Sequence, residues 1–198
     1  MRIAKFSLAL AFLVVSGLAV FAAHEAGSAD MQNQSHAPQY TQDGKLVRPK
    51  DYREWIFLSS GIGMTYGSAN TGDPMFDNVF VNPVAYRSFL QTGSWPDKTV
   101  LVVEGRKSAA KGSIITGGRF QTDLEAIEVE VKDLSRPSKW TFYGFPGSAE
   151  LGAAFPPSAN CYSCHRDNTA VDNTFVQFYP TLIPIAKEKG TYRNTADH

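Results

Sequence analysis

The sequence predicts an α+β domain, built mainly on an antiparallel β-sheet of about five strands with a few helices. Three observations indicate this class. Residues 126–132, AIEVEVK, alternate between apolar and polar side chains, as half-buried antiparallel strands do. Residues 82–93, NPVAYRSFLQTG, carry the start and stop signals of a helix. Apolar residues make up 43% of the 198-residue chain and charged residues 19%, which lets one domain bury a core.

The predicted strands follow in chain order. Residues 52–60, YREWIFLSS, form the first strand, although a short helix also fits its start. Residues 77–82, DNVFVN, alternate like a strand, and residues 99–105, TVLVVEG, are apolar throughout and suit a central strand. Residues 126–132 come next, and residues 139–145, KWTFYGF, are aromatic and favour a strand.

The alternation over residues 126–132 also predicts which of its side chains are buried. The apolar set should face the core: Ile127, Val129 and Val131. The charged set should face solvent: Glu128, Glu130 and Lys132.

Two helices are predicted. In residues 82–93, Asn82 is the N-cap, Pro83 takes the first helical position and Gly93 ends the helix. The buried face of this helix is expected to carry three residues: Tyr86, Phe89 and Leu90. A last helix is expected within residues 172–190, where two prolines would kink or end it.

Residues 1–29 have the layout of a secretory signal peptide. Two basic residues precede an apolar run over residues 6–23, and small residues follow, so that cleavage fits after Ala22 or after Ala29. The alternative is a retained anchor helix, because the apolar run nearly reaches the ~20 residues that span a bilayer. We expect the cleaved form, which places the protein in the periplasm if its source is a Gram-negative bacterium.

The rest of the chain divides into three parts. Residues 30–45 are polar and aperiodic, as in a flexible tether, residues 46–187 hold the compact domain, and residues 188–198 form a polar tail. The formal net charge is zero, and charges of both signs are mixed along the chain. This balance indicates neither a nucleic-acid partner nor attraction to an anionic membrane.

Both cysteines of the chain lie in residues 158–168, SANCYSCHRDN, and a histidine directly follows the second. Four chemistries use such a pair of cysteines. A disulfide across a two-residue gap closes little of the chain. A thioredoxin-like redox pair follows a strand, whereas a proline-rich loop precedes Cys161. A zinc site needs further ligands, and the other histidines lie towards the two ends of the chain.

The fourth chemistry is c-type haem attachment, for which C-x-x-C-H is the signature, and the sequence favours it. The thiols of Cys161 and Cys164 would bond to the vinyl groups of one haem c per chain. His165 would bind the iron as proximal ligand through its neutral ring. The C-terminal segment is therefore expected to form a haem-attachment loop or helix. Export fits, because this attachment is made outside the cytoplasm.

Several segments, taken in order, resemble the cytochrome P-460 family over roughly residues 46–183. They are YREW, DNVFVNPVAYRSFLQTGSWPDKT, GGRFQ, EVEVKD, WTFYGF and CYSCHRDNTAVDNTFVQFYPTL. The resemblance implies an exported mono-haem c-type protein with a mainly antiparallel fold, often dimeric, so that a homodimer is a candidate assembly. It also implies a five-coordinate iron with an open distal face. The implied partners are a small ligand, nitric oxide or hydroxylamine, and a redox partner protein.

The family is known for oxidising hydroxylamine, and a sister group, the cytochromes c′-beta, binds nitric oxide or carbon monoxide beneath an aromatic cap. Two features separate them: a lysine cross-linked to the haem edge and a proton-handling residue in the distal pocket. Here Val103 takes the place of the lysine, and Lys107 lies about 13 Å further along the strand. The loop before the motif offers Ala154 and Phe155, with Glu150 further back. We therefore expect an apolar distal pocket and a haem held by two thioethers alone.

Three functions stay open: a hydroxylamine-oxidising enzyme, a nitric-oxide-binding module and an electron-transfer cytochrome with His/Met ligation. Glu104 ends an apolar strand and is the candidate base for the enzyme. Met64, in a glycine-rich segment, is the candidate sixth ligand for the electron carrier, and its alternative role is to fill the core. Phe76 and Phe80 are candidates either to cap the open face or to pack in the sheet.

Overall fold

The protein is described by a computed structural model, which covers residues 36–65 and 72–195. The described residues from Ala37 onward form one compact unit. The predicted signal peptide, residues 30–35 of the predicted tether and the last three residues of the tail lie outside the described residues. Within the described ranges, no helix has the length and the apolar character needed to cross a membrane.

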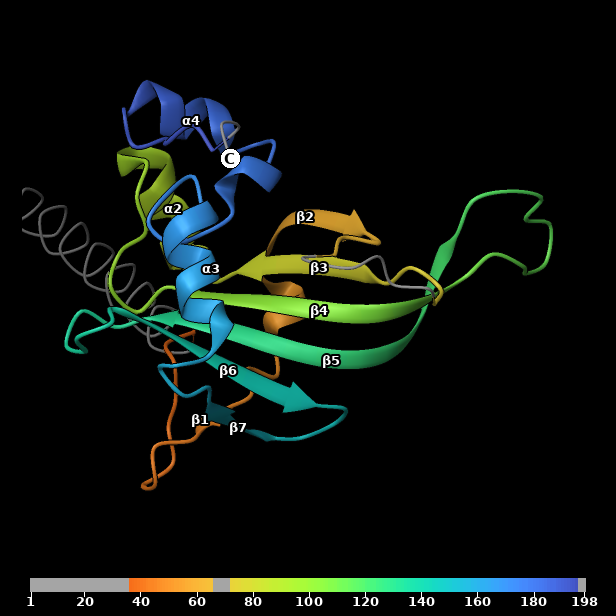
Figure 1. The fold of residues 1–198 in the computed structure, drawn as a ribbon, viewed down its shortest axis with the longest axis horizontal. Helices are drawn as coiled ribbons and strands as arrows, with labels where there is room; N and C mark the ends of the chain where they lie inside the picture. Colours follow the sequence, from red (N-terminus) through yellow and green to blue (C-terminus); the bar gives the residue numbers. More distant parts are fainter. Residues whose placement is uncertain (1–35, 66–71, 196–198) are drawn as a thin grey trace, which may run out of the picture. The chain divides into compact units, whose positions relative to one another are not determined.

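The described part of the chain forms one sheet of seven strands in the order β1-β7-β6-β5-β4-β3-β2, with every neighbouring pair antiparallel (Figure 1). The strands are β1 (Leu46–Val47), β2 (Ile56–Ile62), β3 (Phe76–Val81), β4 (Val100–Ala109), β5 (Phe120–Lys132), β6 (Trp140–Pro146) and β7 (Leu151–Ala154). The predicted class is confirmed. The sheet is larger than expected because β1 and β7 are too short to show an alternating pattern in the sequence.

Three helices accompany the sheet in the described residues, together with two short 3-10 turns. The helices are α2 (Pro83–Thr92), α3 (Asn160–Asn168) and α4 (Ile183–Glu188), and the turns are η1 (Tyr52–Glu54) and η2 (Val176–Phe178). In Figure 1, α3 crosses one face of the sheet, and α2 and α4 lie at the same end of it. Thr191, just after α4, donates from its hydroxyl to the carbonyl of Gly93, just after α2, which fastens the two helices together.

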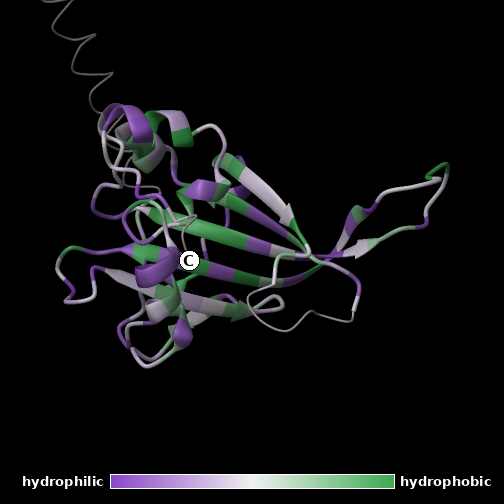
Figure 2. Cartoon of the chain, turned by 45° about the horizontal axis from the view of Figure 1, so that its top comes forward, coloured by the Kyte–Doolittle hydropathy of each residue, from purple (hydrophilic) through white to green (hydrophobic). Residues whose placement is uncertain are grey.

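The register of the central strands separates two faces of the sheet. Leu101 pairs with Glu130, and Glu130 pairs with Phe142, so these side chains point to the face that α3 covers, here called the α3 face. Val102 pairs with Val129, and Val129 with Tyr143, on the η1 face, where η1 and Trp55 pack. Figure 2 shows the resulting alternation of hydrophilic and hydrophobic residues along the long strands.

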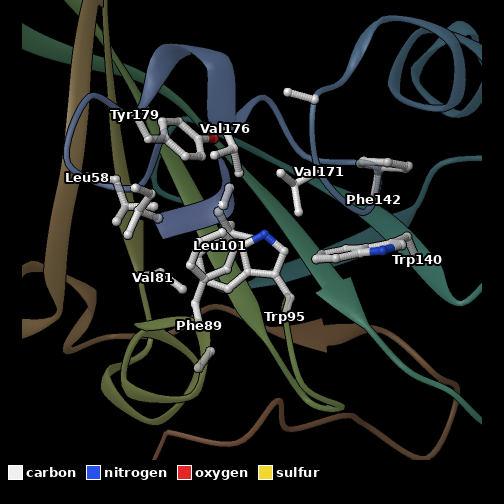
Figure 3. Packing of buried hydrophobic residues seen from close by; sticks show 14 residues of the cluster. Leu58, Val81, Phe89, Trp95, Leu101, Trp140, Phe142, Val171, Val176 and Tyr179 are labelled. Atoms are coloured by element: carbon white, nitrogen blue, oxygen red, sulfur yellow. The ribbon is translucent and has the colours of Figure 1, made fainter. Parts of the chain in front are cut away.

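Each face carries its own hydrophobic cluster. The cluster on the η1 face includes Ile127, Val129 and Val131, all at most 1% exposed, which confirms that prediction. The cluster on the α3 face joins the sheet to α2 and to the C-terminal segment, as Figure 3 shows for Phe89, Trp95, Val171 and Val176 among others. This second cluster fixes the C-terminal segment, and α3 with it, against the sheet.

The helix signals in the sequence hold in part. Pro83 begins α2 and Gly93 ends it with a left-handed φ of 71°, as predicted. Phe89 is buried, but Leu90 is 38% exposed, so the expectation that Leu90 shares the buried face is wrong. The helix faces the sheet through Ala85 and Phe89, four residues apart, and the next residue points away. The predicted last helix is split into η2 and α4, with a proline between them.

Candidate functional site

A cavity of about 670 Å³ lies between the α3 face of the sheet and the segments that carry α3 and η2. Strands β2, β3, β4, β5 and β6 all contribute to its lining, and Cys161, Cys164 and His165 line it from α3. A volume of this size is within the usual range of cofactor sites, roughly 300–1,000 Å³.

Helix α3 places the three motif residues on one side. Cys161, Cys164 and His165 stand at relative positions i, i+3 and i+4, which share one face of an α-helix. Both thiols are free and half-buried, and burial raises the pKa of the Cys161 thiol. Two of the last carbonyls of α3 accept hydrogen bonds from side chains. Thr169 donates from its hydroxyl to the carbonyl of His165, and Asn168 donates from its amide to that of Cys164 (3.1 Å).

The ring of His165 is held in one orientation and one tautomer. Its Nδ1 lies 2.8 Å from the backbone carbonyl of Asn173, which only accepts, so Nδ1 carries the proton and donates it. Phe142 and Phe175 contact the ring, with ring centroids 4.5 Å and 4.7 Å from that of His165. Nε2 is left with its lone pair and faces Glu130, whose Oε1 is 3.7 Å away. A histidine that binds a metal ion needs this arrangement, with one ring nitrogen held by a hydrogen bond and the lone pair of the other free for the metal.

Three carboxylates line the same cavity: Asp77, Glu128 and Glu130. Glu130 is buried, at 9% exposed, whereas Glu128 is exposed and lines the cavity. Burial raises the pKa of all three, and Asp77 adds to the effect on Glu128. Glu130 is therefore not solvent-facing as predicted, whereas Glu128 is exposed as predicted, on the wall of the cavity. The expectation of an apolar pocket is wrong, because three carboxylates line it. The alternation in the sequence correctly separated the two faces, but it could not tell a cavity from open solvent.

Glu104, the candidate base, does not reach the cavity. It pairs with Ile127 across β4 and β5, which puts it on the η1 face, and its side chain is buried there. Tyr52, Arg53 and Arg106 all donate to its carboxylate. Burial alone would raise the pKa of Glu104, but these hydrogen bonds outweigh it and lower the pKa to about 2. Glu104 therefore joins η1 to the sheet and is not among the residues that line the cavity.

The other candidate residues divide between the two faces. Met64 and Val103 line the cavity, as does Phe155 from the loop before α3. Phe80 packs on the η1 face against Tyr52, with ring centroids 5.5 Å apart, and does not cap the cavity.

The described lining of the cavity contains neither a lysine nor a cluster of side chains that could hold a bare metal ion. No lysine is among the described residues that line the cavity, and Lys107 forms an ion pair with Glu125 (3.0 Å) instead. Within residues 36–65 and 72–195, no group of three or more His, Cys, Asp and Glu side chains is placed to hold a bare metal ion.

The arrangement fits a covalently attached haem. Two free thiols and a histidine with an available Nε2 line one cavity, which has the size for a cofactor and walls of aromatic and carboxylate side chains. Sequence reasoning missed Asn173, whose backbone carbonyl fixes the tautomer of His165, because a carbonyl leaves no signature in the sequence.

Comparison with known protein families places the chain in a described family. A family model described as cytochrome P460 matches residues 49–176, which is more than half of the chain. No curated protein matches the chain.

Proposed function

The chain belongs to the cytochrome P460 family and is a haem cytochrome of that type, and from this premise we propose that it is an exported mono-haem protein that binds nitric oxide or hydroxylamine. One haem c is attached through Cys161 and Cys164 and ligated by His165. The observation that carries the proposal is the hydrogen bond from His165 Nδ1 to Asn173, which leaves Nε2 available in a cavity that both thiols line.

Each group in the cavity has a task in this proposal. A haem held by these residues would supply a redox-active iron that can bind a small ligand. Phe142 and Phe175 both pack against the imidazole of His165 and help to keep it in place. Phe155 contributes an apolar wall, and Gly144 leaves room for it, since a Cβ at residue 144 would stand 2.8 Å from the Phe155 ring. Neutral diatomic ligands such as nitric oxide need few hydrogen bonds, so an apolar wall beside the iron is sufficient for them to bind.

A second candidate function, hydroxylamine oxidation, is favoured by the carboxylates of Asp77 and Glu128. Oxidation of hydroxylamine releases protons, which a positioned base must accept. Both residues line the cavity, and burial raises the pKa of each towards the range in which proton exchange is efficient. The same groups are not needed for binding nitric oxide, so the two functions separate experimentally.

The alternative function is electron transfer by a haem with His/Met ligation, for which Met64 would be the sixth ligand. Met64 lines the cavity but is 37% exposed, and its thioether folds back towards Gly61, where an added Cβ would stand 2.8 Å from the sulfur. The sulfur therefore packs against the backbone of β2, and the side chain is more than a third exposed. We therefore propose an iron without methionine ligation, reduced or oxidised by a separate redox partner protein.

The visible spectra of the purified holoprotein test this proposal. We expect a five-coordinate, high-spin haem in both oxidation states, with spectral changes on adding nitric oxide or hydroxylamine. The matched control is Met64→Leu, which should leave these spectra unchanged. A low-spin spectrum that Met64→Leu converts to high spin would establish His/Met ligation and overturn the proposed ligand-binding site.

A further inference from the structure

The backbone carbonyl of Asn173, which accepts the hydrogen bond from His165, belongs to a tight turn over residues 171–174, here called the proximal turn. The amide of Thr174 donates to the carbonyl of Val171 (2.8 Å), and the amide of Val171 donates back to that of Thr174 (3.4 Å). Asp172 and Asn173 occupy the two central positions with left-handed φ angles of 48° and 59°. Asp and Asn tolerate this conformation better than other residues with a side chain, so the local sequence suits the turn.

A buried lysine fastens the proximal turn to the sheet. Lys132, at the end of β5, is only 8% exposed, although its position in the alternating strand predicted a solvent-facing side chain. Its Nζ donates to the backbone carbonyl of Trp95 (2.7 Å) and to the carboxylate of Asp172. The Nζ also lies 5.9 Å from the centroid of the Trp140 ring. Because a buried cation is costly without an anion, the burial of Lys132 depends on Asp172.

An uncharged contact holds the other end of the turn. Trp95 donates from its indole Nε1 to the hydroxyl of Thr174 (2.8 Å), and Thr174 is fully buried. Figure 3 shows Trp95 and Val171 within the same hydrophobic cluster. The proximal turn is therefore fixed by Trp95 and by Lys132, and the only side chain that it offers to the lysine is that of Asp172.

We propose that Lys132 and Asp172 are positioning residues that set the strength of the hydrogen bond from His165 to Asn173. Through this bond they tune the binding of Nε2 to the haem iron. A stronger hydrogen bond at Nδ1 makes the imidazole a more basic ligand, which favours ferric over ferrous iron. The inference rests on the proposed function, because it takes His165 as the axial ligand.

Two variants of the holoprotein separate positioning from plain electrostatics. Removing a nearby cation in Lys132→Met lowers the haem reduction potential by charge alone, whereas removing an anion in Asp172→Asn raises it. Loosening of the His165–Asn173 bond raises the potential in both variants and shifts the iron–histidine stretching band of the ferrous haem to lower frequency. We expect the band to shift down in both variants, the potential to rise in both, and the double variant to shift no further than the larger single change.

The exposed pair of Lys107 and Glu125 on the same sheet provides the control, since Lys107→Met and Glu125→Gln should leave the band in place. Asp172→Asn removes the charge but keeps a residue that tolerates the left-handed φ of 48°, so the backbone of the proximal turn is not strained, and its band is compared with that of Glu125→Gln. This comparison decides the matter even if Lys132→Met does not fold. An unshifted band in Asp172→Asn, or potentials that move in opposite directions in the two charge variants, would overturn the inference. A wild-type ferrous protein without an iron–histidine band would instead refute the proposed function itself.

Discussion

Glu104 and Glu128 lie on opposite faces of the sheet, although each is the sequence neighbour of the residue that pairs with the other. Val103 pairs with Glu128, and Glu104 pairs with Ile127. One step along β4 therefore separates the cavity lining from the η1 face. Because of this single step, Glu104 is a structural carboxylate, and the acids near the proposed haem are Glu128 and its neighbours on the α3 face.

Glu104→Gln should destabilise the fold without altering the haem site. It removes the charge that Tyr52, Arg53 and Arg106 share, and we expect a loss of about 2–3 kcal/mol in the free energy of unfolding at pH 7. The pKa of Glu104 is lowered from an ordinary 4.5 to about 2, so its contribution is complete above pH 4.5 and is lost as pH falls towards 2. Denaturant unfolding across this window measures the effect.

The matched control for Glu104→Gln is Glu125→Gln, which removes an exposed carboxylate paired with Lys107 and should cost less than about 1 kcal/mol. Wild type and Glu104→Gln should converge in stability near pH 2. Equal stability at pH 7 would show that the buried network contributes nothing, and a changed affinity for nitric oxide would show that Glu104 does act on the haem site.

Glu128→Gln should separate hydroxylamine oxidation from nitric oxide binding. If Glu128 accepts protons, its removal lowers the rate of hydroxylamine oxidation by about 10²–10⁴-fold. The wild-type rate should rise with pH through the raised pKa of Glu128, because a base acts in its deprotonated form. Steady-state kinetics with an artificial electron acceptor measures both effects. Nitric oxide affinity should be unchanged, and an undiminished oxidation rate in Glu128→Gln would exclude this residue as the base.

The attachment motif could be predicted from the sequence because its chemistry depends on local spacing. Cys161, Cys164 and His165 fall on one helix face by their positions alone, and the structure brings all three to one cavity. The antiparallel fold could be predicted for the same reason, since the alternation along β5 correctly separated Val129 from Glu130.

Two kinds of feature could not be predicted, and both are non-local. The packing of distant segments decides whether the charged side chains of β5 are buried, so the alternation alone wrongly predicts that Glu130 and Lys132 face solvent. Glu130 lines the cavity, and Lys132 packs against Trp95 and Asp172. The role of Glu104 depends on Arg53 and Tyr52, some fifty residues earlier in the chain. The short strand β1 is recognisable only through its pairing with β7.

His165→Ala should keep the haem attached through its two thioethers but remove the proximal ligand. The spin state and the affinity for nitric oxide should both change, because no other described histidine lines the cavity. Absorption spectra of the ferric and ferrous variant measure the change. A spectrum identical to that of the wild type would mean that another residue binds the iron.

The haem should carry no bond to a lysine. Val103 lines the cavity where the resemblance places a cross-linked lysine, and Lys107 is held by Glu125. After proteolysis, mass spectrometry should find haem only on the peptide with Cys161 and Cys164. Haem that also retains a lysine-containing peptide from residues 102–111 would contradict this expectation.

The most direct test of the account is the intact mass of the protein after maturation in a periplasm that has haem-attachment machinery. The account predicts the mass of the chain plus one haem, with Cys161→Ala/Cys164→Ala losing that addition. An unmodified mass, with both sulfurs free or joined as a disulfide, would contradict covalent haem attachment and, with it, the proposed function.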